Sequence, residues 1–354
     1  MYKIEEIDKN LKTSEIDGCD LVFCDVKNPP FSVSGLLVPD ELRRLPRLTG
    51  VYDGVNILSQ NTAGGKVRFS TNSPYIAVYA EIGDACHMGH MAISGSCGFD
   101  LYRLCDGEEQ FVGAYIPPTG IVHGQTHFHS IKKVSHTFTE MTAYTLYMPL
   151  YNGVKTLHIG LAPGSAIEKG ADFLMEKPIV YYGSSITQGG CASRPGNAYP
   201  SLITHKLNVN HINLGFSGSA CGEMGMADYL AGLSMSLFVY DYDYNAWNPE
   251  HLAETHEVFF KRIRQAQPDL PVIMLSAPCI VVDSDKSLRR DIIKSTYESV
   301  VAKGDKNVWF LDGGQIYDGI FADCCTVDGV HPNDLGFARM AEKLLPIVKE
   351  ALKM

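Results

Sequence analysis

Residues 178–189 read Pro-Ile-Val-Tyr-Tyr-Gly-Ser-Ser-Ile-Thr-Gln-Gly, an apolar run that ends abruptly in small and polar residues. A nearly continuous apolar run is typical of a parallel strand covered on both faces. Similar runs follow at 211–216, 236–241, 271–276 and 307–312. Helix-like stretches alternate with them at 197–207, 223–233, 249–266, 287–302 and 334–352, the last with an expected kink at Pro346. Strict β-α alternation predicts a five-stranded parallel sheet with helices on both sides.

The chain before this segment follows a different pattern. Short segments alternate with a two-residue period or are rich in aromatic and branched residues, at 66–71, 75–82, 98–104, 144–150 and 155–162. Many short strands separated by turn residues favour a β-sandwich. The change of pattern lies within 164–177, so we expect a β-domain over residues 1–170 and an α/β domain over residues 171–354.

Composition sets broad limits. The chain has 354 residues, which suggests about two domains. Its 40 acidic and 30 basic residues give a net charge of −10, which argues against a nucleic-acid partner. The one dense basic cluster, Arg43, Arg44 and Arg47, is expected to be a solvated surface.

No apolar run approaches the ~18–20 residues that cross a bilayer, so a membrane partner is not expected. The first residues also lack the pattern of a secretory signal, which favours a cytoplasmic location. The ten cysteines are then expected to be free thiols, the adjacent Cys324 and Cys325 included.

Function in open α/β sheets collects in the loops beyond the carboxyl ends of the strands. In this chain those loops carry Ser185 after the first strand, Gly215 at the end of the second, Asn245 after the third, and Asp328 with His331 beyond the fifth. A serine, backbone N–H groups, an amide and an Asp/His pair are the groups that acyl transfer requires. The sequence therefore predicts that these residues converge at one edge of the sheet.

Each residue type suits one step of that chemistry. His331 can accept the proton of Ser185, which makes the serine a nucleophile, and Asp328 can orient the imidazole. The backbone N–H groups of Ser185 and Gly215 and the side-chain amide of Asn245 can stabilise the oxyanion of a tetrahedral intermediate.

These motifs resemble those of a known family. Gly183-Ser-Ser-Ile-Thr resembles the first block of the SGNH (GDSL) hydrolases, and Asp328-Gly-Val-His-Pro resembles their last. Upstream, Gly98-Phe-Asp-Leu-Tyr resembles the GxDLY signature of an amino-terminal β-domain found in a subset of SGNH esterases. The resemblance implies a flavodoxin-like α/β/α catalytic domain after a jelly-roll-like β-sandwich. Ser184 replaces the usual aspartate of the first block, and the register favours Ser185 as the nucleophile.

The resemblance also implies a substrate class. It points to a small-acyl esterase, in particular a carbohydrate O-acetylesterase that acts on small-molecule or oligosaccharide esters without a cofactor. Arg194, within the polar run 189–197, and the aromatic residues Tyr244 and Trp247 are candidate substrate contacts. A thioesterase, a small-lipid esterase, an acyltransferase and a non-catalytic carbohydrate-binding protein stay open, as does homo-oligomerisation.

Three groups of residues could instead be the ligands of a metal ion. They are Cys86 with His87 and His90; His123 with His127 and His129; and the pair Asp241 and Asp243. The histidines belong to the β-domain, where strand alternation places some at the surface, and the aspartates fit better as supports of the active-site loop. We therefore expect no metal site.

Overall fold

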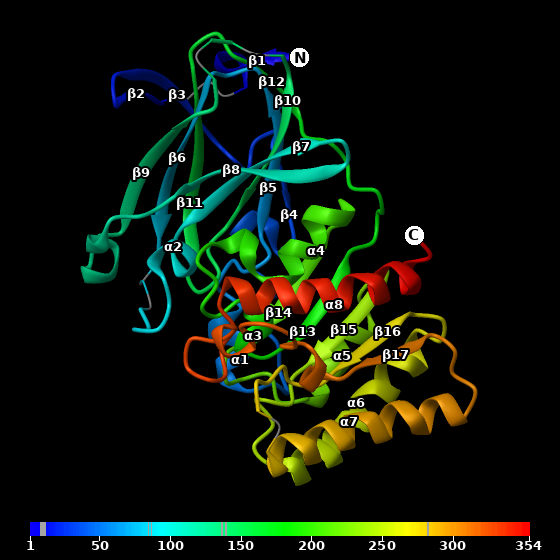
Figure 1. Cartoon of the computed structure of the whole chain (residues 1–354). Helices are drawn as coiled ribbons and strands as arrows, with labels where there is room; N and C mark the ends of the chain where they lie inside the picture. Colours follow the sequence, from blue (N-terminus) through cyan, green and yellow to red (C-terminus); the bar gives the residue numbers. More distant parts are fainter. Residues whose placement is uncertain (8–11, 84, 86, 136, 139, 282) are drawn as a thin grey trace.

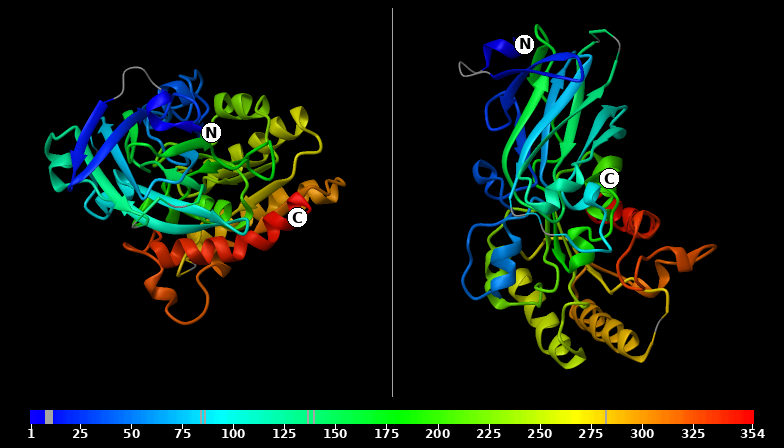
Figure 2. Two further views of the ribbon diagram at one scale, coloured as in Figure 1. Left: turned by 90° about the horizontal axis from the view of Figure 1, so that it is seen from above. Right: turned by 90° about the vertical axis from the view of Figure 1, so that its left-hand side faces the viewer.

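The computed structural model describes residues 1–354 apart from 8–11, 84, 86, 136, 139 and 282. A β-rich part and an α/β part lie end to end, with α4 and α8 near their boundary (Figure 1). The right-hand view of Figure 2 shows the same division after a quarter turn about the vertical axis. No helix among the described residues is long and apolar enough to span a membrane.

The β-rich part contains two antiparallel sheets. The larger has the order β1-β12-β5-β10-β7-β8, with β4 beside β5. Its strands are β1 (Tyr2–Lys3), β4 (Ser32–Ser34), β5 (Lys66–Thr71), β7 (Phe99–Cys105), β8 (Glu108–Tyr115), β10 (Thr142–Tyr147) and β12 (Ala166–Lys169). The smaller has the order β2-β3-β11-β6-β9 and contains β2 (Lys12–Ile16), β3 (Cys19–Asp25), β6 (Tyr75–Ile82), β9 (His127–Lys133) and β11 (Val154–Leu161).

The two sheets bury one common core. Alternate residues of both sheets meet in it, for example Val67 and Phe69 of β5 with Val78 of β6 and Ile159 of β11. Alternation between buried and outward positions is what packs two sheets face to face. The predicted β-sandwich is thus present, and most strands of the chain are antiparallel.

Parallel pairing is confined to the second part. Its sheet has the order β14-β13-β15-β16-β17, and every neighbouring pair is parallel. The order follows the doubly wound pattern in which the first two strands reverse position. The strands are β13 (Ile179–Gly183), β14 (His211–Gly215), β15 (Leu237–Asp241), β16 (Val272–Leu275) and β17 (Val308–Leu311).

Helices cover both faces of this sheet. Apolar residues of α4 and α8 pack on one face, and those of α5, α6 and α7 pack on the other. The helices are α3 (Ser185–Gln188), α4 (Tyr199–Leu207), α5 (Met224–Ala231), α6 (Pro249–Ala266), α7 (Ser284–Ala302) and α8 (Asp334–Leu352), with α1 (Asp53–Leu58) and α2 (Ile93–Ser96) in the β-rich part. The strand and helix ends predicted here agree with the structure to within three residues, and α8 continues through Pro346.

One segment of the β-rich part packs against the parallel sheet instead of the two antiparallel sheets. Leu45 and Val55, with Leu37, Leu48, Val51 and Leu58 beside them, pack into the core that α5 and α6 form on the parallel sheet. Residues 37–58 therefore cover a face of the α/β part, although they precede it by more than a hundred residues.

Arg44 anchors this segment. Its side chain is fully buried, and its guanidinium donates to the carbonyl oxygens of Asn213, Gly215 and Leu58. The guanidinium also lies 4.5 Å from the centre of the Phe216 ring. The prediction of a solvated basic surface is wrong for Arg44, because its hydrogen-bond acceptors are backbone carbonyls far along the chain.

The GxDLY motif forms a second anchor. The Asp100 carboxylate is buried and accepts hydrogen bonds from the Gly196 N–H at 3.0 and 3.1 Å, from the Tyr102 hydroxyl and from the Arg194 guanidinium. Gly196 is a glycine because a Cβ atom there would lie 2.2 Å from the Tyr102 hydroxyl. The motif thus fixes the loop that follows α3.

Further buried polar groups pair across the boundary. Glu109 of β8 accepts from His205 of α4 at 2.8 Å, and Arg68 donates to Asn208 at 2.7 Å. Burial alone would raise the pKa of Glu109, but hydrogen bonds from His205, Thr145 and Tyr147 lower it to about 2. Buried charges are tolerated when they are paired in this way. The two parts of the chain are therefore joined by polar as well as apolar contacts.

Replacing Asp100 tests this anchor. We expect Asp100→Ala to lower the free energy of unfolding by about 3 kcal/mol, because it leaves the Gly196 N–H and Arg194 without their acceptor. Urea unfolding followed by circular dichroism measures the change. Asp20→Ala, at an exposed position of β3, is the control and should stay within about 0.5 kcal/mol. Equal stability of the two variants would contradict the anchor.

Candidate active site

The site begins where β13 ends. Helix α3 follows at once and has only four residues, Ser185–Gln188. The Ser184 hydroxyl accepts the Ile186 N–H at 3.2 Å and so caps this helix. Of the two adjacent serines, Ser184 therefore has a local structural task, while the Ser185 hydroxyl is directed elsewhere.

Ser185, His331 and Asp328 form a connected chain of side chains. Ser185 Oγ lies 2.9 Å from His331 Nε2, and His331 Nδ1 lies 2.8 Å from Asp328 Oδ2. Ser185 follows β13, whereas the other two lie beyond β17, so the fold joins residues 146 positions apart. The arrangement suits proton transfer from the serine to an oriented imidazole.

Asp328 is held in its ionised form. Partial burial would raise its pKa, but the backbone N–H groups of His331 and Val330 and the His331 imidazole outweigh this and lower it to about 2. A carboxylate that accepts several N–H groups is stabilised in its charged form. Asp328 is therefore a fixed anionic partner for His331 Nδ1.

Helix α3 is held from several sides. Asn213 Nδ2 donates to the Thr187 carbonyl at 2.6 Å, and the Thr187 hydroxyl donates to Asp241. Two contacts come from the β-rich part: the Tyr151 hydroxyl donates to the Ser185 carbonyl at 3.0 Å, and Gln188 Nε2 donates to the Leu150 carbonyl at 3.1 Å. Sequence reasoning missed these supports, because no local pattern marks Tyr151 or Gln188.

Asp241 and Asp243 have structural partners. Asp241 accepts from Thr187 and from the Tyr199 hydroxyl, and Asp243 accepts from the Ala277 N–H at 2.8 Å. Burial raises the pKa of Asp241 to about 8 and that of Asp243 to about 6. Both aspartates thus support the loops around α3, as expected from the sequence.

Gly215 lies at the end of β14, where the sequence predicts an oxyanion donor. Its N–H donates to Asn213 Oδ1 at 2.9 Å, so this hydrogen bond is already made within the chain. A Cβ atom at Gly215 would lie 2.1 Å from the Gln188 nitrogen. A glycine at 215 is thus required for the close approach of α3 to β14, and its N–H is engaged with Asn213 in this structure.

Asn245 lies beside the loop that follows Gly215. Its Nδ2 donates to the Phe216 carbonyl at 2.9 Å, which fixes the amide and leaves its second N–H available. In the same loop, the N–H groups of Phe216, Ser217 and Ser219 all have acceptors within the chain. The N–H of Gly218 has no acceptor among the described residues, and its φ of 64° lies in the left-handed region.

The three candidate substrate contacts lie in different environments. Arg194 is bound to Asp100 and lies 3.8 Å from the Phe111 ring centre, and with Phe111 and Asn197 it lines a hollow of about 360 Å³. The Tyr244 hydroxyl donates to the Pro278 carbonyl at 3.0 Å. Trp247 is 64% exposed, and its ring lies 5.6 Å from that of Tyr52.

Among the described residues, the groups suggested by the sequence are not gathered closely enough to hold an ion. His87, His123, His127 and His129 are exposed, and Cys86 lies outside the described residues. In the part of the chain that the structure describes, one group of side chains is close enough to hold an ion, namely His90, Cys191 and His331. The His90 and His331 ring centres are 5.2 Å apart, which brings a loop of the β-rich part over the serine–histidine pair.

Burial and the nearby Asp328 carboxylate raise the pKa of the Cys191 thiol to about 12. The thiol therefore stays protonated at neutral pH, and a protonated thiol is a poor nucleophile. None of the nine described cysteines, Cys324 and Cys325 included, forms a disulfide with another of them.

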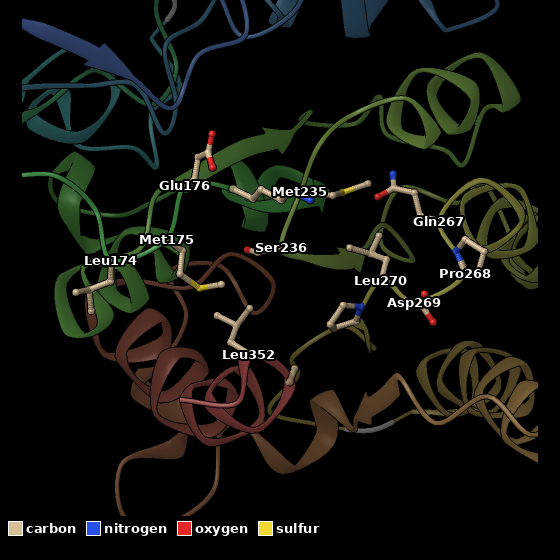
Figure 3. A pocket seen from close by; sticks show the side chains of 13 residues that line it. Leu174, Met175, Glu176, Met235, Ser236, Gln267, Pro268, Asp269, Leu270 and Leu352 are labelled. Carbon is tan, nitrogen blue, oxygen red and sulfur yellow. The ribbon is translucent and has the colours of Figure 1, made fainter.

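A hollow of about 730 Å³ lies far from these residues. Figure 3 shows its lining, which includes Met175, Ser236 and Leu270. These residues precede β13, β15 and β16, so the hollow is at the amino ends of the strands. Ser185 and His331 follow the carboxyl ends, at the opposite edge of the sheet.

Two family models match the chain. The model of the GDSL-like lipase/acylhydrolase family matches residues 176–349. A model for the amino-terminal region of SGNH-hydrolase-type esterases, named for GxDLY, matches residues 21–167. No curated protein matches the chain significantly.

Solved structures match over most of the chain. A protein described as a GDSL-like lipase from Bacteroides ovatus is 31% identical, with 94% of this chain and 98% of that chain covered and a TM-score of 0.82. The salicylyl-acyltransferase SsfX3 of a tetracycline biosynthetic pathway is 17% identical, with 94% and 99% covered and a TM-score of 0.69. An acetyl xylan esterase from Butyrivibrio proteoclasticus is 12% identical, with 94% and 99% covered and a TM-score of 0.56. The last two likenesses establish similarity of fold.

The buried carboxyl of Asp241 predicts a pH dependence of stability. Its pKa is raised to about 8 in the folded chain, so the folded state binds the proton more tightly than the unfolded state. The resulting contribution to the free energy of unfolding is fully present below about pH 4 and is lost as the pH rises towards 8. Asp241→Asn removes this loss. We expect the unfolding free energy of the variant minus that of the wild type to increase by a few kcal/mol between pH 5 and pH 8, measured by urea unfolding. Parallel stability curves for the two proteins would contradict the raised pKa.

Proposed function

Because the chain belongs to the GDSL-like lipase and acylhydrolase family and is therefore an esterase, we propose that it removes small acyl groups, above all O-acetyl groups, from carbohydrates. The proposal is carried by one observation, the connected chain from Ser185 through His331 to Asp328. We also propose the domain division at 170/171, with a flavodoxin-like catalytic domain and a jelly-roll-like β-domain.

Ser185 is the nucleophile in this mechanism. As its Oγ attacks the acyl carbon, its proton passes to His331 Nε2, which lies 2.9 Å away. Asp328 holds Nδ1 and stabilises the imidazolium that forms. The imidazolium of His331 then gives its proton to the departing sugar oxygen, which leaves as a hydroxyl, and the neutral His331 next activates the water that hydrolyses the acyl-enzyme.

The negative charge on the tetrahedral intermediate needs donors. The Ser185 N–H at the start of α3 and the second N–H of Asn245 Nδ2 are two of them. For the third donor we propose the Gly218 N–H in place of Gly215, because it has no acceptor among the described residues and lies on the loop that Asn245 contacts. Donors fixed before the reaction are what lower the barrier of such a step.

The substrate assignment is supported by an exposed aromatic pair. Trp247 and Tyr52 are 64% and 39% exposed, and Trp247 is two residues from Asn245. Flat apolar ring faces beside polar groups suit the C–H faces of sugar rings. The likeness of fold to an acetyl xylan esterase agrees with an acetylated sugar as substrate.

An acyltransferase is the second candidate, favoured by the likeness of fold to SsfX3. Such an enzyme would form the same acyl-enzyme but pass the acyl group to an alcohol instead of water. Acetate release in water distinguishes the two, since a strict transferase yields free acid slowly and an acylated acceptor quickly.

The central prediction concerns Ser185. We expect the wild type to release acetate from acetylated xylo- and manno-oligosaccharides, and to hydrolyse 4-nitrophenyl acetate faster than the octanoate. Ser185→Ala should lower kcat by at least about 10³-fold, because the nucleophile is lost. Enzymatic acetate assays and nitrophenolate absorbance measure the rates.

Fluorophosphonate labelling followed by mass spectrometry provides the control. Ser184→Ala removes only the cap of α3 and should still be labelled at Ser185, whereas Ser185→Ala should not be labelled. Labelling of Ser184, or full activity in Ser185→Ala, would overturn the assignment. Faster hydrolysis of the octanoate would overturn the choice of acyl group alone.

Trp247 gives a separate prediction about the sugar. We expect Trp247→Ala to raise KM for acetylated oligosaccharides about 3- to 10-fold with little change in kcat, because a stacking contact is worth about 1 kcal/mol. KM for 4-nitrophenyl acetate, which has no sugar ring, should not change. Tyr2→Ala, an exposed aromatic residue (57%) on β1, is the control. An equal effect of Trp247→Ala on both substrates would contradict a sugar contact.

A further inference from the structure

We propose that His90, Cys191 and His331 form a binding site for a divalent transition metal, best suited to Zn²⁺, and that the bound ion inhibits the esterase. The inference rests on the proposed function in one respect, that His331 is the catalytic base. The site itself rests on the positions of the three side chains and is tested separately from catalysis.

The three side chains are close enough to share an ion. One potential ligand atom from each lies within 4.8 Å of the others. Zinc takes nitrogen ligands at about 2.0–2.1 Å and sulfur at about 2.3 Å, so ligand atoms around a tetrahedral ion are roughly 3.3–3.8 Å apart. A movement of about 1 Å brings the three ligand atoms to this spacing. His90 is half-buried on the loop between β6 and α2, and rotation of its side chain can provide that movement.

His331 offers the ion a specific nitrogen. Its Nδ1 is occupied by Asp328 at 2.8 Å, so Nε2 is the nitrogen left for a metal. A histidine whose other nitrogen donates to a carboxylate is the usual form of a zinc-bound histidine. Nε2 is also the atom that lies 2.9 Å from Ser185 Oγ. An ion bound there therefore takes the lone pair that would accept the serine proton.

The ligand set favours one class of metal. Two imidazoles and a thiol are soft or intermediate ligands, which select Zn²⁺, Co²⁺ or copper over Mg²⁺ and Ca²⁺. On binding, the Cys191 thiol loses its proton to solvent and the thiolate sulfur becomes a ligand, while Ser185 keeps its own proton. A fourth position stays open for water, as three protein ligands leave it.

The ion would also join the two domains. His90 comes from the β-domain, whereas Cys191 and His331 follow α3 and β17 in the α/β part. Neither part of the chain holds three ligands alone. We therefore predict that the metal inhibits only when the loop that carries His90 lies where the structure places it.

The first experiment measures inhibition. Chelator-treated enzyme is assayed with 4-nitrophenyl acetate while ZnSO₄ or MgCl₂ is added, and each variant is compared with its own metal-free rate. We expect Zn²⁺ to abolish hydrolysis, chelator to restore it, and Mg²⁺ to have no effect. His90→Gln and Cys191→Ser should each need at least about tenfold more Zn²⁺ for half-inhibition, since each loses one ligand.

Cys324→Ser is the matched control, because Cys324 is an exposed thiol near His331 in the sequence and should leave the zinc titration unchanged. If His90→Gln and Cys191→Ser are inhibited by zinc as strongly as the wild type, the proposed site is wrong.

The second experiment tests binding without catalysis. Co²⁺ is added to Ser185→Ala, and absorption is recorded from the near ultraviolet to the visible. We expect a thiolate-to-cobalt charge-transfer band that saturates at one equivalent and disappears in the double variant with Cys191→Ser. The band in Ser185→Ala would support the site even if the wild type hydrolysed no ester. Absence of the band would overturn it.

Discussion

The positioning of a single helical turn is the constraint on which the rest of the molecule depends. Helix α3 has four residues and carries Ser185, and a helix of this length is unstable by itself. It is fixed by the Ser184 cap, by Asn213 and Asp241 from neighbouring strands of the sheet, and by Tyr151 and Leu150 from the β-domain. Asn213 of β14 and Asp241 of β15 are thereby used to hold the helix that carries Ser185.

The β-rich part contacts the segments that hold Ser185. The GxDLY motif places Asp100 and Tyr102 against the loop that follows α3, and Arg44 holds the carbonyl of Gly215 beneath it. Tyr151 donates directly to the carbonyl oxygen of Ser185. The β-rich part therefore helps to position Ser185, and loss of its contacts should affect the position of Ser185 as well as stability.

The sequence predicts the apolar framework well and the buried polar contacts poorly. Strands such as β13 and β15 and helices such as α6 could be found because burial on both faces, or an amphipathic stripe, leaves a local pattern. The proposed triad could be suggested from the sequence because Asp328 and His331 share one short loop. Arg44 was wrongly expected at the surface, and the contacts of Arg194 and Gly215 could not be predicted. Their partners fold against them from distant parts of the chain: Asn213 and Gly215 for Arg44, Asp100 for Arg194, and Gln188 beside Gly215.

His331 is the residue at which these constraints meet. One of its nitrogens is fixed by a carboxylate whose pKa is about 2, and the other faces Ser185. In the proposed mechanism, the hydrogen bond to Asp328 orients His331 as a base. The same hydrogen bond makes Nε2 a strong metal ligand, and the nearby thiol of Cys191 and imidazole of His90 complete a set that soft metals prefer. The proposed catalysis and the proposed inhibition by zinc thus use the same nitrogen of His331, and the loop that carries His90 supplies a ligand that the metal needs and the proposed catalysis does not.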